Sequence, residues 1–303
     1  MHSRNALSAN DLFLSENLAI LLIFLQKSDI IKSVYILYII RLYSKNSENV
    51  MKKTDKFTLC IPMYNEASII ADTARTLSES MKSFYDQGLF DRYEILFSDD
   101  GSTDGSAETV NSLGLENVRV IGYPENRGKG CAVRCAMLDA AGDDPEDGHV
   151  IMFTDADLAY GTDVIGSFAQ AFAENPEKDI FIGSRNLSGD GYEGYTFIRR
   201  LASKVYIKFL CAVGGFRLSD SQCGCKAFRA SAAKKIFSHT ETDGFAFDFE
   251  AILFAGRYKM KIGELPVKII NHRESKIRLW RDVFLMLIDL FKMRRRVART
   301  KLD

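Results

Sequence analysis

The sequence lacks several patterns that mark common protein classes. It has no Cys-x-x-Cys pair, and its four histidines do not group with its six cysteines, so nothing supports a structural zinc site. We expect reduced, mostly buried thiols instead. Neither the Gly-x-x-x-x-Gly-Lys-Ser/Thr phosphate loop nor the Gly-x-Gly-x-x-Gly fingerprint occurs, which leaves kinases and dehydrogenases without support. There is also no internal repeat and no low-complexity linker.

Long apolar runs are missing as well. The stretches LAILLIFL at 18–25 and VYILYII at 34–40 are apolar, but polar residues separate them. Neither reaches the roughly 20 apolar residues of a spanning helix, and no small-residue cleavage site follows, as a signal peptide requires. We therefore expect residues 1–53 to be either an extension before a natural start at Met51 or a peripheral membrane-associated segment.

The chain has no net charge, yet its charges are unevenly distributed. From Lys276 to the end, nine Lys and Arg stand against three Asp, so this part is near +6 and the rest near −6. A basic end of this kind indicates an anionic surface as partner. We predict a membrane surface and no nucleic acid; the pattern does not predict an oligomeric state.

Short apolar runs alternate with helical patterns from residue 57 onward. The runs are 57–61, 93–100, 118–123, 150–157 and 179–185, and the helical patterns are 66–87, 104–113, 128–141 and 162–174. This alternation predicts a doubly wound α/β domain, which we place at 54–275. Beyond residue 186 we expect a helix at 194–215, a loop entering a strand at 220–230, a helix at 245–257 and a last strand at 261–270.

Polar segments follow the predicted strands: PMYNE, DDGSTDGS, PENRGKG, DADLAYG and SRNLSG. Each alone is ordinary turn chemistry. Together they place carboxylates, an Arg and a Lys at the carboxyl ends of the strands, where open α/β sheets bind ligands. The sequence therefore predicts a site at this edge.

The pair Asp155 and Asp157 has three interpretations. A phosphohydrolase would use Asp155 as nucleophile, but such sites carry Thr where this chain has Ala159. A structural role would have one Asp cap the next helix, which Thr162 does more naturally. A metal site would hold Mg²⁺ or Mn²⁺, hard cations that bridge substrate phosphates. We favour the metal site, because a divalent cation relieves the repulsion between the two carboxylates.

Two further residues fit a nucleotide-sugar donor. Asp100, at the tip of the second strand, can accept hydrogen bonds from a nucleoside. Lys129, between glycines at the start of a helix, can pair with phosphate.

The ordered segments CIPMYNEASII, LFSDDGSTDGS, NRGKGCAVRCAM, FTDADLA and IGSR resemble family 2 glycosyltransferases of the GT-A fold. DSQCGCKAFRASAAKKIF, GFAFDFEAILFAGR, ELPVKI and SKIRLWRDVFLMLIDLFKMRRR resemble the dolichyl-phosphate β-glucosyltransferase branch and its bacterial polyprenyl-phosphate relatives. The resemblance runs from about Phe57 to Arg296. It implies a mixed, doubly wound sheet flanked by helices.

The resemblance also implies roles for single residues. The nucleoside pocket would be lined by Pro62, Tyr64, Glu66 and Asp100, and Asp155 and Asp157 would handle metal and diphosphate. Arg185, Arg199 and Ser203 match positions that hold the acceptor phosphate in related dolichol-phosphate sugar synthases; surface charge on a helix is the alternative for Arg199.

A lipid phosphate acceptor lowers the need for a general base. Its second pKa is about 6, so it is mostly dianionic near neutral pH. Positioning and charge neutralisation should then supply most of the rate. Asp220 would orient the acceptor, act as a base or begin a helix. In-line attack would invert the anomeric carbon and give a β-linked product.

We thus expect metal-dependent transfer of glucose from UDP-glucose to a polyprenyl phosphate at the cytoplasmic face of a membrane. The alternatives are mannose from GDP-mannose, a hydroxyl acceptor in a polysaccharide, a D-x-D phosphohydrolase and a non-catalytic nucleotide-sugar binder.

The segment 276–303 is expected to form a basic amphipathic helix. Apolar residues recur at helical spacing, with basic residues around and after them: Leu279, Trp280, Val283, Phe284, Leu287, Ile288 and Phe291, then Arg281, Lys292 and Arg294 to Arg296. Such a helix either lies in an anionic lipid interface or packs back on the domain.

Overall fold

The computed structural model describes residues 53–189, 191, 197–244, 246–271 and 290–302. The order of elements is β1 (Thr54–Met63), α3 (Ile70–Asp86), β2 (Phe90–Asp99), α4 (Ser106–Ser112), β3 (Val118–Gly122), α5 (Lys129–Ala141), β4 (His149–Phe153), α6 (Asp163–Glu174), β5 (Ile180–Ser184), α7 (Phe197–Gly214), β6 (Lys226–Arg229), α8 (Ala230–Phe237), α9 (Phe247–Arg257) and β7 (Ile262–Pro266). Residues 290–299 are also helical.

The seven strands form one mixed sheet in the order β3-β2-β1-β4-β6-β5-β7. The predicted mixed, doubly wound sheet is confirmed. Strands β1 to β4 pair in parallel, and β5 pairs in parallel with β7. Strand β6 is inserted antiparallel between β4 and β5, with Lys226 opposite both Phe153 and Ile182. Because β6 runs backwards, the loop before it lies at the same edge as the ends of β4 and β5.

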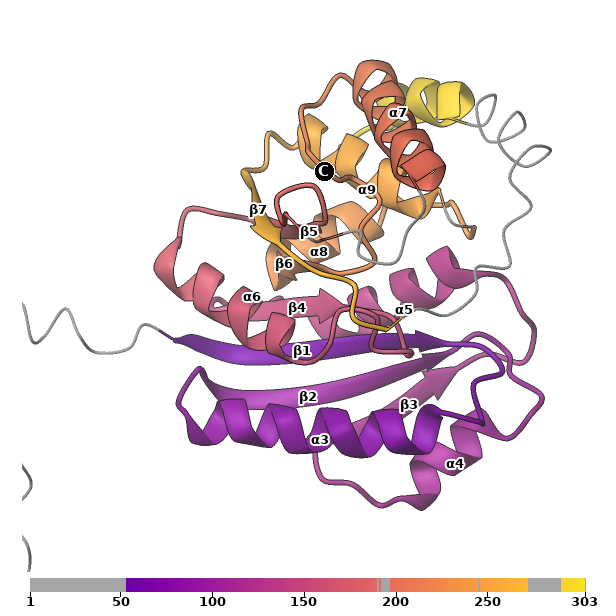
Figure 1. The fold of residues 1–303 in the computed structure, drawn as a ribbon, viewed down its shortest axis with the longest axis vertical. Coiled ribbons are helices and arrows are strands. Elements are labelled where there is room, and N and C mark those ends of the chain that lie inside the picture. The colour runs from indigo at the N-terminus through magenta and orange to yellow at the C-terminus, as the bar shows by residue number, and fades with distance from the viewer. Residues whose placement is uncertain (1–52, 190, 192–196, 245, 272–289, 303) are drawn as a thin grey trace, which may run out of the picture. The chain divides into compact units, whose positions relative to one another are not determined.

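Alternating side chains of the strands supply two apolar layers. In β1, Cys60 packs into the layer with α5, α8 and α9, whereas Leu59 and Ile61 face the layer with α3, α4 and α6. Figure 1 shows α3 and α4 on one side of the sheet and α8 and α9 on the other. Burial on both faces explains why the strands are continuous apolar runs.

The ends of three parallel strands are aligned. Met63 of β1 pairs with Asp99 of β2, and Cys60 pairs with Phe153 of β4. The loops that begin at Tyr64, Asp100 and Thr154 therefore open at one edge of the sheet.

Several predicted boundaries are wrong. The fourth strand ends at Phe153 rather than at residue 157, so both aspartates lie in the following loop. The first helix begins at Ile70, because residues 64–69 form a loop that is hydrogen-bonded to residues 102–106. Helix α8 follows β6 without a break and was not predicted, and the last strand ends at Pro266.

Two regions about which the sequence made predictions are not described by the structure. The segment 1–53, apart from Lys53, and residues 272–289 lie outside the described residues. The described helices include none that is both long and apolar enough to cross a membrane. In the helical residues 290–299, Leu290, Met293 and Val297 are buried, whereas Phe291 is 54% exposed.

Candidate active site

The end of β1 and the loop after it carry three of the predicted donor residues. Pro62 and Glu66 are partly buried, and the ring of Tyr64 is 46% exposed. Asn65 has a left-handed backbone (φ 52°) and accepts the N–H of Thr103 at 2.9 Å. These contacts fix the loop at the edge of the sheet and leave Tyr64 available for stacking.

Asp100 is almost fully buried, with 3% exposure. Its carboxylate accepts hydrogen bonds from the Tyr123 hydroxyl (2.6 Å), the Asn126 amide (2.8 Å) and the N–H groups of Arg127 and Gly128 (both 2.9 Å). Burial and the bond to Asp100 both raise the pKa of Tyr123. Asp100 thus holds the segment before α5 in place, a contact that the sequence did not predict.

Lys129 is the first residue of α5, and its ammonium forms an ion pair with the carboxylate of Asp155. Burial opposes the charge of Lys129, but the attraction of Asp155 outweighs it and raises the pKa of Lys129. The structure therefore brings together two residues that were predicted separately, one for phosphate and one for metal.

Gly224, in the loop before β6, lies against the same carboxylate. A Cβ atom at this position would overlap Oδ2 of Asp155. The N–H of Gly224 donates to the hydroxyl of Tyr160 at 3.0 Å. The glycine is therefore what allows the loop to approach Asp155.

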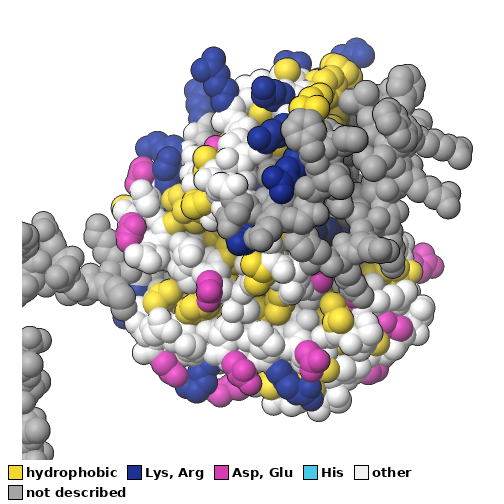
Figure 2. Space-filling view, viewed as in Figure 1, with side chains coloured by type: hydrophobic (Ala, Val, Ile, Leu, Met, Phe, Trp, Pro, Cys, Tyr) yellow, Lys and Arg dark blue, Asp and Glu magenta, His cyan; other side chains and the backbone are white. Residues whose placement is uncertain are grey.

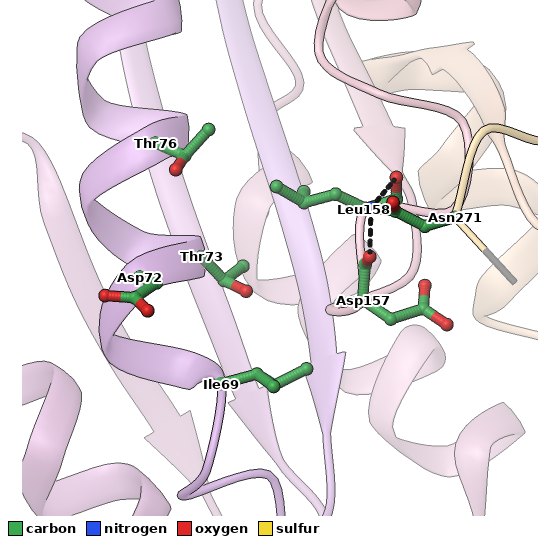
Figure 3. A pocket seen from close by; sticks show the side chains of 7 residues that line it. All are labelled: Ile69, Asp72, Thr73, Thr76, Asp157, Leu158 and Asn271. Carbon is green, nitrogen blue, oxygen red and sulfur yellow. Dashed lines mark hydrogen bonds between the residues drawn. The ribbon is translucent and has the colours of Figure 1, made fainter. Parts of the chain in front are cut away.

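Asp157 lies in the loop after β4 and is held by hydrogen bonds from Ala159 and Asn271. Its Oδ1 accepts the N–H of Ala159 at 3.1 Å, and its carbonyl accepts the amide of Asn271 at 3.2 Å. A pocket borders this loop on the α3 side, lined by Ile69, Asp72, Thr73, Thr76, Asp157, Leu158 and Asn271. In Figure 3 the carboxylate of Asp157 points away from α3.

The donor set at this position suits a hard divalent cation. Asp155 and Asp157 offer carboxylate oxygens, and both residues are partly exposed. Within the described residues no third His, Cys, Asp or Glu completes a cluster. A Mg²⁺ or Mn²⁺ ion, which usually keeps waters and substrate phosphates as ligands, fits such an open pair. Neither Asp caps α6, and Thr162 makes no side-chain cap either.

Arg185 and Asp220 form a two-pronged ion pair beside this loop. Nε of Arg185 lies 2.6 Å from Oδ2 of Asp220, and Nη2 lies 2.9 Å from Oδ1. Asp220 is fully buried and lies in the loop between α7 and β6, so the prediction that it begins a helix is wrong. Burial alone would lower the pKa of Arg185, but Asp220 raises it above its usual value.

Arg199 and Ser203 both lie on α7. Ser203 is partly exposed, and the side chain of Arg199 lies outside the described part of the structure. Helix α7 also exposes two apolar side chains to solvent, Leu201 (52%) and Val205 (59%).

A buried ion pair that sequence reasoning missed lies under the site. Nζ of Lys226 lies 2.5 Å from Oδ1 of Asp248 and donates to the carbonyl of Cys223 at 2.6 Å. Lys226 is 1% exposed. Burial raises the pKa of Asp248, while Lys226 and Lys129 oppose the shift. The sequence did contain a hint of this ion pair, because Lys226 is a charged residue at the start of a short apolar strand.

The chain matches a protein-family model and individual proteins of known function. Residues 58–237, well over half of the chain, match the family model described as glycosyl transferase family 2. A dolichyl-phosphate beta-glucosyltransferase of Trichomonas vaginalis is 28% identical over 82% of this chain and 77% of its own length. The Saccharomyces cerevisiae enzyme of that name is 29% identical over 78% and 73%, and the human one is 28% identical over 74% and 70%.

Solved structures of similar fold include a Mycobacterium tuberculosis glucosyl-3-phosphoglycerate synthase. Its complex with uridine diphosphate has a TM-score of 0.57 and 18% identity, and covers 82% of each chain. A complex of the same enzyme with Mn²⁺, UDP-glucose and glycerol 3-phosphate has a TM-score of 0.53 over 80% of this chain and 78% of that one, at 18% identity. At this identity the likeness concerns the fold, and it confirms the predicted GT-A fold.

Proposed function

The chain belongs to glycosyl transferase family 2, and from this premise we propose that it moves glucose from UDP-glucose to a polyprenyl or dolichyl phosphate with inversion at the anomeric carbon. The observation that carries the proposal is the single edge that holds Asp155, Lys129 and Arg185. Relatives named dolichyl-phosphate beta-glucosyltransferases support the choice of sugar and acceptor. As a member of this family, the protein is a glycosyltransferase.

On the donor side, Asp155 and Asp157 would hold Mg²⁺ or Mn²⁺. When bound, the ion neutralises the diphosphate as it leaves. The exposed Tyr64 stacks on the base, and the loop held by Asp100 places Lys129 at the diphosphate. Lys129 then exchanges part of its contact with Asp155 for phosphate oxygens.

On the acceptor side, Arg185 binds the lipid phosphate through its planar guanidinium. The buried carboxylate of Asp220 fixes the orientation of this guanidinium. With both oxygens engaged by Arg185, Asp220 orients the acceptor site and does not remove a proton. Arg199 and Ser203 approach the same phosphate from α7. The phosphate dianion is itself the nucleophile, so no general base is required.

The membrane face is proposed to include α7 and the C-terminal segment. Figure 2 shows Lys and Arg side chains gathered over this end of the molecule. The exposed basic residues there include Arg200, Lys204, Lys208, Lys292, Arg294 and Arg295. With Leu201, Val205 and Phe291 they present the mixture of basic and apolar groups that suits a peripheral contact with anionic lipid on the cytoplasmic side.

Family membership sets aside the phosphohydrolase and the non-catalytic binder. GDP-mannose as donor and a polysaccharide hydroxyl as acceptor remain the competing substrates. A hydroxyl acceptor needs a base to remove its proton. The pairing of Asp220 with Arg185 favours the phosphate acceptor.

The test is a transfer assay on the purified full chain. UDP-glucose, UDP-GlcNAc, UDP-galactose and GDP-mannose are offered in turn with undecaprenyl or dolichyl phosphate and Mg²⁺ or Mn²⁺. We expect label from UDP-glucose in the organic phase, abolished by EDTA and restored by Mn²⁺. Asp157→Asn and Arg185→Ala should lose this label, whereas the exposed Asp163→Asn keeps it. Nucleotide release without lipid labelling would contradict the acceptor, and labelling from another donor would contradict the sugar.

A further inference from the structure

Helix α5, which begins with Lys129, has no side-chain cap of its own. Its N-cap residue is Gly128, with φ 113°, and no side chain bonds to the first turn. The first N–H groups of a helix lack partners within the helix. Here the N–H of Gly130 donates to the carbonyl of Asp243 at 2.7 Å, and that of Cys131 is shared between the carbonyl of Gly128 at 2.9 Å and that of Asp243 at 3.3 Å. The cap is thus supplied by a distant loop, residues 241–244.

Gly128 and the carboxylate of Asp243 allow this loop to contact the start of the helix. A Cβ atom at Gly128 would lie 2.6 Å from the carbonyl oxygen of Asp243, so only glycine allows the approach. The carboxylate of Asp243 lies 2.5 Å from Arg134 and 3.2 Å from Arg127. Burial works against its charge, but the two guanidinium groups lower the pKa of Asp243. A negative charge here also complements the helix dipole beside these basic residues.

The same loop is fastened from its other side by Glu250. This residue of α9 is fully buried, and its Oε2 accepts the N–H of Thr242 at 2.8 Å and that of Glu241 at 3.2 Å. The guanidinium of Arg296 forms an ion pair with Glu250 and a second with Glu241 at 2.7 Å. Arg296 belongs to the helical residues 290–299, and its ion pair with the buried Glu250 directs it into the domain. The sequence predicted it as one of the basic residues of an amphipathic helix.

We propose that loop 241–244 is a strap that couples the C-terminal helix to the donor side of the site. Arg296 holds Glu250, Glu250 holds the loop backbone, and the loop caps the helix that presents Lys129 to Asp155. Asp243 and Glu250 are therefore positioning residues. The expected effect of this loop on turnover rests on the proposed function. The structural coupling between Arg296 and the start of α5 does not depend on it.

Hydrogen exchange on the purified full chain tests the coupling without substrate. Arg296→Gln is compared with Arg299→Gln, which removes the same charge from an exposed position of the same helix. We expect the amide of Gly130 to exchange about tenfold faster in Arg296→Gln, because its partner loop opens more often. Its exchange should be unchanged in Arg299→Gln. Arg296→Lys, which keeps a cation for Glu250, should restore part of the protection.

Kinetics separate positioning from general weakening. Arg296→Gln should raise the KM for the nucleotide sugar about fivefold, and Arg299→Gln should leave this KM unchanged. The KM for the lipid phosphate should be equal in the two variants, because each removes one positive charge from the C-terminal segment. Equal exchange at Gly130 in the two variants would overturn the coupling. Faster exchange in Arg296→Gln, found together with a wild-type protein that turns over no nucleotide sugar, would refute the proposed function and leave the coupling through loop 241–244 intact. If Arg296→Gln unfolds, Arg296→Lys against Arg299→Lys makes the same comparison.

Discussion

Arg185 and Asp220 face each other as two parallel prongs, with Nε to Oδ2 at 2.6 Å and Nη2 to Oδ1 at 2.9 Å. The two residues come from loops after β5 and before β6, which meet only because β6 runs antiparallel to β5. The arrangement fixes a cation at the mouth of the site by means of a carboxylate that solvent does not reach.

The first prediction concerns this pair. Asp220→Asn keeps the shape but removes the charge, so it leaves Arg185 poorly oriented. We expect the KM for the lipid phosphate to rise about tenfold with the donor KM unchanged, and the free energy of unfolding to fall by about 3 kcal/mol, as for other broken buried pairs. Steady-state kinetics and urea unfolding measure both. Arg217→Lys, at an exposed position, is the control. A change confined to the donor KM would contradict the assignment.

The second prediction concerns the approach of Gly224 to Asp155. In Gly224→Ala the new methyl group would overlap Oδ2 of Asp155 and displace the carboxylate. The Mn²⁺ concentration for half-maximal activity should rise about tenfold, in line with a disturbed ligand. Gly256→Ala serves as control, because open space surrounds that glycine in α9. Identical Mn²⁺ titrations in the two variants would show that Asp155 does not contact the metal.

The third prediction is a pH dependence of stability caused by His149. Burial lowers its pKa from 6.5 to about 4, and its Nε2 lies 2.9 Å from the Thr58 hydroxyl. The unfolded chain binds this proton near pH 6.5 and the folded chain near pH 4. The stabilisation is therefore complete above pH 6.5 and is lost as the pH falls toward 4. Between pH 7.5 and 5 it should account for about 2 kcal/mol.

Urea unfolding at both pH values measures this loss in the wild type and in His149→Gln. Gln does not titrate in this range and can still bond to Thr58. The variant should lose about 2 kcal/mol less than the wild type between the two pH values. Equal losses would mean that other groups cause the acid sensitivity.

The fourth prediction concerns the buried pair of Lys226 and Asp248. Lys226→Met leaves the carboxylate of Asp248 buried without its cation, which should cost about 3–5 kcal/mol of unfolding free energy. The double variant Lys226→Met/Asp248→Asn should recover a large part of this loss, because no charge is then buried. Thermal and urea unfolding of the four proteins of the cycle give the coupling energy. Additive losses would show that the two residues act independently.

The parts of the fold that sequence predicted are those with continuous apolar runs. Strands β4 and β5 are buried at every residue, and β1 and β2 are buried over residues 57–61 and 95–99, so their apolar residues indicate these strands directly. Strand β6 has only four residues, begins with a charged Lys226 and passes into α8 without a turn. No Gly or Pro and no shift in the spacing of apolar residues separates β6 from α8, so the sequence did not predict α8.

The residues discussed for the site and its support fall into two groups. Asp155, Asp157, Lys129 and Arg185 were predicted from the polar segments that follow the predicted strands and from the family resemblance. Asp243 and Glu250 were not found, since their partners are backbone groups and arginines far away in the chain. The glycines at 128 and 130 carried the only signal, because glycine in a helix start indicates that another segment comes close.

The borrowed cap of α5 has a consequence for the order in which the newly made chain folds. A polypeptide leaves the ribosome from its N-terminus and folds by units as they emerge. Strands β1 to β4 can assemble early, but the N–H of Gly130 finds its acceptor only once residue 243 has been synthesised. The nascent protein thus carries its first four strands with an unfinished start of α5 until the loop before α9 has been made. Translation of the last fifth of the chain is therefore the step that completes the start of α5, where Lys129 meets Asp155.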